Sequence, residues 1–177
     1  MLEGEDRARF EALVLPHLDA AFNLALWMLR NPADAQDVTQ EALLRAYRFF
    51  HTFRTGNARA WLLQIVRNPC YTWLQKKDNW EDVDELEEGS LPAETCTPET
   101  LAIASGDRQR LAGALEKLPA SFREVLVLRE LEGCSYKEIA AITGRPLGTV
   151  MSALARARRH LRDALVRPSQ MEAHREL

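Results

Sequence analysis

Apolar side chains recur every three or four residues along the first part of the chain, which is the spacing of one buried helix face. The pattern predicts a first helix that carries this face from Phe10 to Met28 and ends at Asn31-Pro32. A second helix is predicted to begin with Asp34 as its N-cap, the residue whose side chain accepts free N–H groups of the first turn. The positions expected to pack in these two helices are Phe10, Leu13, Val14, His17, Leu18, Ala21, Phe22, Ala25, Met28, Val38, Ala42, Leu43, Ala46 and Phe50.

A third helix is predicted from Ala58 to Lys77, after a turn at Gly56-Asn57. Pro69 lies inside this helix and lacks a backbone N–H, so we expect it to kink the helix near Ile65. The side chains expected to pack are Trp61, Leu62, Ile65, Val66 and Tyr71. The first part of the chain is therefore a predicted lobe of three helices.

Four helices are predicted in residues 108–167, three short ones and a longer last one. The first covers 108–117, and the second covers 122–131 with Ser121 as its N-cap. Ser135 and Glu138 have the spacing of a capping box at the start of the third. A turn at 143–146 leads into a long helix whose apolar stripe is Leu147, Val150, Leu154, Ala157, Leu161 and Leu165. No segment alternates as a strand, so the predicted fold class is all-α.

Charge changes this picture because it is distributed in blocks. Residues 1–77 carry 10 Lys/Arg and 8 Asp/Glu, residues 78–107 carry 10 acidic side chains and no basic one, and residues 108–167 carry 12 basic and 6 acidic side chains. The acidic block contains Gly89, Pro92 and Pro98 and little apolar periodicity, so we expect a flexible linker, the alternative being a solvated acidic loop. The sequence thus predicts two small helical domains, 1–77 and 108–167, a linker over 78–107 and a tail over 168–177.

Several classes of protein are disfavoured by composition. The longest uncharged apolar stretch, Ala20 to Leu29, is far shorter than the roughly 20 residues that cross a bilayer, and no secretory signal is recognisable. We therefore expect a cytoplasmic protein that does not insert into a membrane. The three cysteines, Cys70, Cys96 and Cys134, have no CxxC spacing, which argues against a disulfide framework or a zinc site. The four histidines show no metal-ligand spacing, and no phosphate loop or nucleophilic triad is present, so no metal, cofactor or enzymatic activity is expected.

Residues 135–161 have the arrangement of a helix-turn-helix, with a glycine in the turn. The N-terminus of its second helix can direct backbone N–H groups and Arg145 at DNA phosphates, and polar side chains of the first turns can reach base edges. Four further arginines, Arg156, Arg158, Arg159 and Arg162, add positive potential along that helix. Arginines alone would indicate a solvated helical face, but the turn favours DNA binding.

Three segments together resemble the extracytoplasmic-function (ECF) sigma factors of bacterial RNA polymerase, in the sigma-70 superfamily. These are Asp34 to Phe53, Gly56 to Leu74 and Leu118 to Arg158, in the family's order and on both sides of an acidic linker. The resemblance implies two domains, called regions 2 and 4. It also implies binding to core RNA polymerase and promoter DNA, and regulation by an anti-sigma factor that clamps the two domains.

The resemblance assigns a polymerase-binding segment to the second helix. The residues that match it are Asp34, Asp37, Gln40, Glu41 and Arg45. A carboxylate-rich helix face can pair with basic partner residues and set encounter rate and register. Alternatively, Asp34 and Asp37 cap the helix and complement its dipole, whereas Gln40 and Glu41 lie too deep in the helix for that role.

The resemblance also assigns the third helix and its preceding turn to the minus-10 promoter element. The matching residues are Thr55, Asn57, Arg59, Trp61, Gln64, Arg67, Asn68 and Tyr71. Aromatic platforms, polar pockets and basic side chains are what hold unstacked bases of melted DNA. The helical spacing of Trp61 fits a core residue, so Thr55, Asn57, Arg67 and Asn68 are the stronger candidates.

The helix-turn-helix is assigned to the minus-35 element. The matching residues are Arg145, Pro146, Thr149, Ser152, Arg156 and Arg159. Many relatives have arginine where this chain has Ala153, and some have it at Met151, so a contact common in the family is expected to be absent. The leading hypothesis is a promoter-specificity subunit that assists DNA melting, and the alternative is a free-standing dimeric helix-turn-helix repressor or activator.

Overall fold

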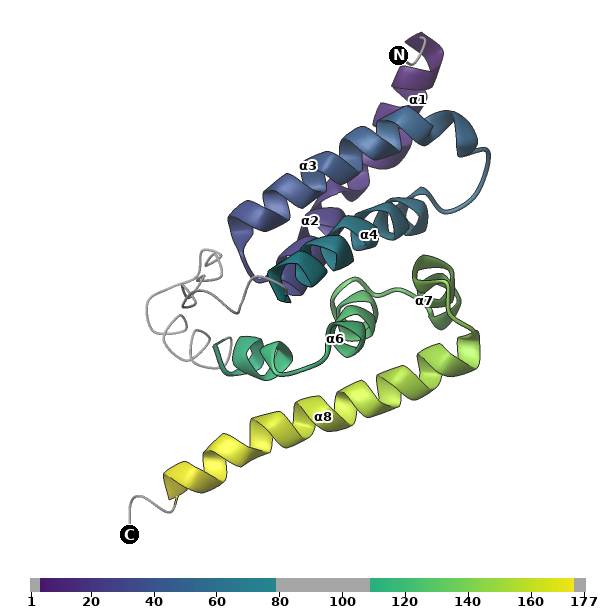
Figure 1. Cartoon of the computed structure of the whole chain (residues 1–177). Coiled ribbons are helices and arrows are strands. Elements are labelled where there is room, and N and C mark those ends of the chain that lie inside the picture. Colours follow the sequence, from purple (N-terminus) through teal and green to yellow (C-terminus); the bar gives the residue numbers. More distant parts are fainter. Residues whose placement is uncertain (1–3, 79–108, 174–177) are drawn as a thin grey trace, which may run out of the picture. The chain divides into compact units, whose positions relative to one another are not determined.

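The computed structural model describes residues 4–78 and 109–173, and every regular element in these two ranges is a helix. The elements are α1 (Gly4–Val14), the 3-10 helix η1 (Leu15–His17), α2 (Leu18–Leu29), α3 (Pro32–Phe49), the 3-10 helix η2 (Phe50–Thr52), α4 (Ala58–Asp78), α6 (Ala120–Leu126), the π-helix η3 (Val127–Leu131), α7 (Tyr136–Thr143) and α8 (Leu147–Ala173) (Figure 1). Residues 109–116 form one further helix. The all-α prediction is confirmed. The predicted acidic linker lies outside the described residues, apart from Asp78.

The chain divides into two compact units. Among the described residues, the first unit contains 4–78 and 137–145, and the second contains 109–136 and 146–173. Each unit has its own set of buried apolar side chains. The first unit therefore includes most of α7 and the turn that follows it, which come after the acidic segment in the sequence.

The core of the first unit lies between α2, α3 and α4, which pack against one another in Figure 1. Leu24 and Met28 of α2, and Leu62 and Leu63 of α4, are almost completely buried, as is Phe50 just after α3. Full burial of one such side chain stabilises the fold by about 1.5–3 kcal/mol. This packing fixes the direction of α3 and α4 and hence which of their residues face solvent.

The predicted first helix is wrong in one respect, because it is two helices separated by η1. Pro16 lies at the start of η1 and has no N–H to donate to the preceding turn, so the α-helical hydrogen bonds stop there. Leu13 was expected in the core but is 38% exposed, whereas Leu24, Leu26 and Leu29 are buried.

Residues Glu5–Leu29 are long and apolar enough to meet the length and composition of a membrane span. Here they form α1, η1 and α2, and the packed side of α2 lies against α3 and α4. Ala21, Leu24, Ala25 and Met28 are fully buried in that packing. The hydropathy of this stretch is therefore explained by its place in the core.

The start of α3 also differs from the prediction, since its N-cap is Asn31 rather than Asp34. The side-chain Oδ1 of Asn31 accepts the backbone N–H of Ala33 at 2.8 Å and that of Asp34 at 3.3 Å. Pro32 follows at the first helical position, where its missing N–H costs nothing. Asn31-Pro32 thus begins α3, while α2 has already ended at Leu29 with Arg30 in the left-handed conformation (φ 62°).

The helix α4 extends without interruption through Pro69, which is buried. Of the side chains predicted to pack, Leu62 and Val66 are buried, while Trp61, Ile65 and Tyr71 are half-buried. Leu63 and Cys70 are buried as well. The helix bounds agree with the predicted Ala58 to Lys77 to within one residue.

In the second unit, α6 packs against α8. Ser121 is not the N-cap of α6: the helix begins at Ala120, and the carbonyl of Pro119 accepts the N–H groups of Phe122 and Arg123 at 2.9 and 3.0 Å. After Leu126 the chain forms the π-helical turn η3 instead of continuing to 131 as an α-helix. The α8 stripe is buried at Val150, Leu154 and Ala157, whereas Leu147 and Leu165 at its two ends are exposed, contrary to expectation.

Candidate nucleic-acid and partner interfaces

One face of α3 is polar and open to solvent along its length. Asp37, Gln40, Glu41 and Arg45 are exposed, as predicted for binding residues. The spacing of positions 37, 40, 41 and 45 places these four side chains on one side of the helix. Glu41 and Arg45 form an ion pair at 2.9 Å between Oε1 and Nη2, and a partner with basic groups would compete with Arg45 for this carboxylate.

Asp34 differs from the other four because it is half-buried at the start of α3. Burial raises the pKa of its carboxyl above the ordinary value, Lys77 opposes this shift, and Asp37 adds to it. Its position in the first turn of the helix is favourable for a negative charge. The alternative reading of Asp34 as the cap is wrong, since Asn31 has that role.

Sequence reasoning missed Leu44, which is 62% exposed in the middle of the polar face of α3. A large apolar side chain surrounded by Gln40, Glu41 and Arg48 is the composition of a protein-binding patch with an apolar centre and a polar rim. The helical period could have revealed it, because Leu43 and Leu44 cannot both face the core.

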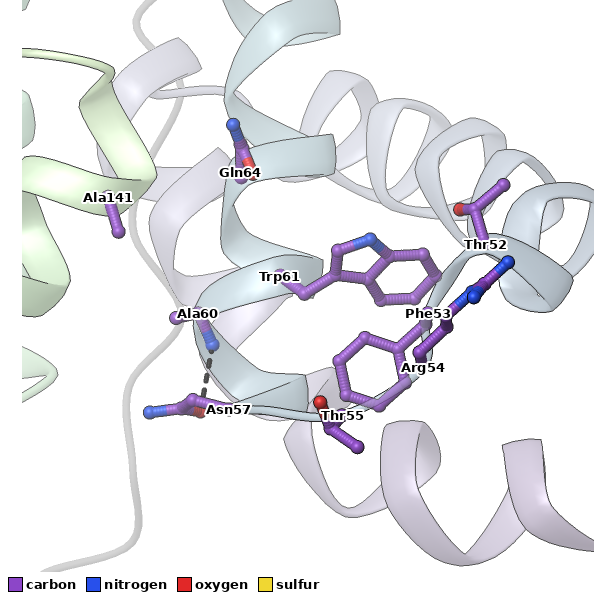
Figure 2. A pocket seen from close by; sticks show the side chains of 9 residues that line it. All are labelled: Thr52, Phe53, Arg54, Thr55, Asn57, Ala60, Trp61, Gln64 and Ala141. Atoms are coloured by element: carbon purple, nitrogen blue, oxygen red, sulfur yellow. Dashed lines mark hydrogen bonds between the residues drawn. The ribbon is translucent and has the colours of Figure 1, made fainter.

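The loop between α3 and α4 forms one wall of a pocket in the first unit (Figure 2). The lining side chains of this segment are Thr52, Phe53, Arg54, Thr55, Asn57, Ala60, Trp61 and Gln64. In Figure 2 the rings of Phe53 and Trp61 lie next to each other, and their centroids are 5.1 Å apart. Trp61 also contacts Phe50 edge-on at 6.1 Å, so it is both part of the core and a wall of the pocket.

The predicted turn before α4 is confirmed, and two residues shape it. Gly56 has φ 126°, a conformation that side-chain-bearing residues rarely adopt. Asn57 Oδ1 accepts the backbone N–H of Ala60 at 3.0 Å, which caps α4. Thr55 and Asn57 are both exposed, so each predicted residue reaches solvent beside the pocket.

The remaining predicted minus-10 residues lie along α4. The guanidinium of Arg67 lies over the ring of Tyr71, with Cζ 4.9 Å from the centroid, and both side chains are half-buried. Gln64 and Asn68, four residues apart, are exposed, while Arg59 is half-buried. The stacked Arg67–Tyr71 pair combines a positive charge with an aromatic face, which are the two groups that bind unstacked nucleotides.

Arg9 of α1 is a second residue that sequence reasoning missed. Its Nη2 donates to the carbonyl of Arg54 at 2.7 Å and to that of Phe53 at 3.4 Å, and its guanidinium lies over the ring of Phe50 at 5.4 Å. Arg9 therefore ties the backbone of the pocket loop to the first helix. No local pattern could have found it, because 45 residues separate Arg9 from Arg54.

The predicted minus-35 residues lie on one side of α8 and in the turn before it. Thr149, Ser152, Arg156 and Arg159 are exposed at helical spacings of three and four, Pro146 is exposed and Arg145 is half-buried. The hydroxyl of Ser152 donates to the carbonyl of Thr149 at 3.0 Å, which leaves its oxygen lone pairs available. This face carries the positive charge and hydroxyl groups that a DNA-reading helix uses.

Three nearby positions bear on the expected charge of this face. Ala153 is buried, whereas Met151 is 51% exposed, so of these two positions only 151 is open to solvent. Arg158 was expected to add to the positive potential, but its Nη2 is 2.7 Å from Oε1 of Glu130, which offsets its charge.

Among the described residues no group of three or more His, Cys, Asp or Glu side chains could hold a metal ion. Cys70 and Cys134 are buried, and Cys96 lies outside the described residues.

Both parts of the chain match known protein families. Residues 13–79 match the family described as Sigma-70 region 2, and residues 108–161 match Sigma-70, region 4. The chain is 35% identical over 170 residues to the ECF RNA polymerase sigma factor SigE of Mycolicibacterium smegmatis, covering 93% of this chain and 64% of that protein. It is 39% identical over 134 residues to the ECF RNA polymerase sigma-E factor of Escherichia coli, covering 71% of this chain and 70% of that protein.

Two solved structures resemble the fold. One is the sigma factor RpoE in complex with the anti-sigma factor NepR from Bartonella quintana, with a TM-score of 0.73, 31% identity, and coverage of 89% of this chain and 96% of that chain. The other is CnrH in complex with the cytosolic domain of CnrY, with a TM-score of 0.61, 27% identity, and coverage of 90% of this chain and 88% of that chain.

Proposed function

Because the chain belongs to the ECF sigma factors of the sigma-70 family, we propose that it is a promoter-specificity subunit that binds core RNA polymerase and directs it to promoter DNA. The observation that carries the proposal is the exposed face of α3, where polar and charged side chains surround Leu44 while the opposite side of the helix is buried. In this role the chain catalyses no bond chemistry and works in the cytoplasm, where the polymerase is. A free-standing repressor is not favoured, since both family matches are to sigma factor regions.

The polymerase would contact the face formed by Asp37, Gln40, Glu41 and Leu44. The carboxylates would pair with basic residues of the partner and set the register, and Leu44 would fill an apolar site at the centre. Asp34 is half-buried, so its carboxyl is less open to a partner than those of Asp37 and Glu41. Arg45 donates to Glu41 at 2.9 Å. Basic residues of the partner would compete with Arg45 for this carboxylate.

The minus-10 element would be held by the loop and the exposed side of α4. Thr55 and Asn57 supply hydrogen-bonding groups beside the pocket, and Trp61 supplies an aromatic wall. Capture of an unstacked base there favours the melted strand over the duplex, which is how binding free energy can assist strand opening. Arg67, Asn68 and Tyr71 continue the surface along the helix.

The minus-35 element would be read as duplex by the turn and α8. Arg145, Pro146 and Thr149 lie at the N-terminal end of the helix, where backbone N–H groups favour phosphate, and Ser152, Arg156 and Arg159 extend the contact. An anti-sigma factor would regulate the chain by covering these surfaces. This part of the proposal is supported by the similar structure of the sigma factor RpoE, which is in complex with the anti-sigma factor NepR.

The test is co-elution of the full chain with core RNA polymerase on a sizing column at near-physiological salt. The unchanged chain is expected to bind stoichiometrically, and Glu41→Arg is expected to elute apart, because it places a positive charge against basic partner residues. Glu11→Arg is the matched control: Glu11 also forms an exposed pair at 2.9 Å with an arginine of its own helix, and the charge change is the same. Equal binding by the two variants would remove α3 from the interface, and elution of the unchanged chain alone would overturn the proposed function.

A further inference from the structure

The π-helical turn η3 has no role in the surfaces described above, yet its side chains make polar contacts with the segment before α7 and with α8. The N–H of Glu132 donates to the carbonyl of Val127 at 3.0 Å, five residues earlier. A π-turn adds one residue to the helical repeat, so the side chains within it point in directions that a regular α-helix would not give them. Such turns are frequently found at functional sites.

Arg129 reaches from η3 to the chain that enters α7. Its Nη1 donates to the carbonyl of Cys134 at 2.9 Å, and its guanidinium lies over the ring of Tyr136 at 4.9 Å. The N–H of Cys134 also donates to the carbonyl of Leu128 at 2.9 Å. Residues 134–136 are therefore fixed to the π-turn by two hydrogen bonds and one cation–π contact.

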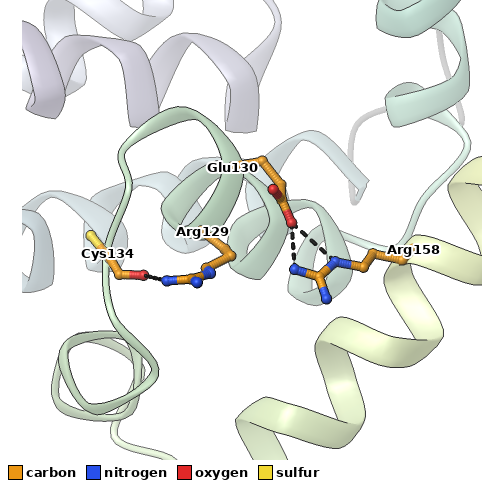
Figure 3. A network of polar contacts seen from close by, with 4 residues as sticks. All are labelled: Arg129, Glu130, Cys134 and Arg158. Carbon is orange, nitrogen blue, oxygen red and sulfur yellow. Dashed lines mark hydrogen bonds and ion pairs between the residues drawn. The ribbon is translucent and has the colours of Figure 1, made fainter.

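Glu130 leaves the same turn in another direction and reaches α8 (Figure 3). Its Oε1 accepts from both Nε and Nη2 of Arg158, at 3.0 and 2.7 Å, although the two residues are 28 positions apart. The hydrogen bond to Glu130 raises the pKa of the Arg158 guanidinium above its ordinary value. Arg158 is separated by only one residue from Arg156 and is next to Arg159, which belong to the candidate DNA face.

We propose that η3 is a clamp that positions the DNA-reading helix: Arg129 fixes the entry to α7, and Glu130 fixes the middle of α8 through Arg158. The inference rests on the proposed function, because positioning matters only if α8 reads DNA. Glu130, Arg129 and Arg158 are positioning residues in this account, and Arg158 is not a phosphate contact. Packing of the buried side chains of α8 sets the rotation of the helix about its axis. The hydrogen-bonded charge pair, which has a fixed direction, restricts that rotation further, and with it the directions of Ser152, Arg156 and Arg159.

The experiment compares Glu130→Ala with the matched control Asp163→Ala, which removes the same charge from the exposed side of α8. The probe is a duplex enriched from a randomised pool by the unchanged chain in complex with core polymerase. The clamp predicts that Glu130→Ala weakens holoenzyme binding about two- to fivefold, the range for an exposed ion pair, with an unchanged slope against salt. If Arg158 instead contacts phosphate, Glu130→Ala frees it and binding becomes equal or tighter, which would overturn the clamp.

Two further measurements separate positioning from general destabilisation and from failure of the proposed function. The exchanged pair Glu130→Arg with Arg158→Glu is expected to regain most of the lost affinity; no recovery would contradict the clamp. Amide hydrogen exchange of the full chain needs no DNA, and Glu130→Ala is expected to speed exchange at 134–136 and in the middle of α8, while the buried helices of the first unit are unchanged. If exchange is faster in Glu130→Ala but the unchanged chain with polymerase enriches no DNA, the proposed function alone is refuted. If both exchange and DNA binding are the same in Glu130→Ala as in the unchanged chain, the clamp alone is refuted.

Discussion

The contact that joins Arg9 to the pocket loop predicts a defect in promoter melting when Arg9 is replaced by alanine. The substitution removes a 2.7 Å hydrogen bond from a charged donor to the carbonyl of Arg54, a longer one to Phe53, and the contact with the ring of Phe50. Hydrogen bonds from charged groups contribute about 1.5–3 kcal/mol when well formed. Arg9 is exposed, so water replaces part of this, and we expect a loss of about 1 kcal/mol, or roughly fivefold in an equilibrium.

This loss acts on the arrangement of residues 53–57, which the loop must hold while it captures an unstacked base. The assay is the fluorescence of 2-aminopurine placed in the opening segment of a duplex that the unchanged holoenzyme selects from randomised DNA. Arg9→Ala is expected to lower the fraction of open DNA about fivefold while co-elution with polymerase is retained. Arg9→Lys is expected to recover part of the signal, since lysine can donate to a carbonyl but cannot lie flat over Phe50.

Arg7→Ala is the matched control, because Arg7 carries the same charge on the same helix and pairs with Glu11 within α1. It is expected to open DNA as the unchanged chain does. Equal opening by Arg7→Ala and Arg9→Ala would refute the reasoning. So would a fall in the free energy of unfolding of Arg9→Ala well above the loss of about 1 kcal/mol expected from this one contact, because the variant would then be generally destabilised.

Two further predictions concern α3. Leu44→Asp is expected to weaken polymerase binding at least tenfold without lowering the melting temperature, because Leu44 is 62% exposed and contributes little to the core; unchanged co-elution would remove Leu44 from the interface. The pKa of the Asp34 carboxyl is raised in the folded chain. Just above the ordinary pKa of aspartate, the folded state therefore binds more protons than the unfolded state, and the free energy of unfolding falls as the pH rises through this range. Asp34→Asn is therefore expected to be slightly more stable than the unchanged chain at neutral pH, with the difference vanishing in acid; chemical unfolding at several pH values measures this, and a difference that grows in acid would contradict it.

The sequence predicted the helical elements and most exposed positions correctly because both depend on local spacing. The three- and four-residue period identifies the inward side of α3 at Val38, Ala42 and Ala46, and the same period places Thr149, Ser152 and Arg156 outside on α8. The order of motifs also identified the family. Two wrong predictions, the single first helix and the Asp34 N-cap, could have been corrected from nearby residues. Pro16 interrupts the first helix, and Asn31 followed by Pro32 is as good a helix start as Asp34.

The contacts that position the candidate surfaces depended on tertiary structure. Arg9 meets Arg54 and Glu130 meets Arg158 across 45 and 28 residues, and only the packing of the helices brings each pair within hydrogen-bonding distance. The π-turn that directs Arg129 and Glu130 has no signature in the apolar period, which predicted a regular helix there. Periodicity determines which side of a helix is buried, whereas the rotation and neighbours of that helix are set by the free energy of packing distant segments together. This packing decides which arginine of α8 points into solvent and which pairs with a glutamate.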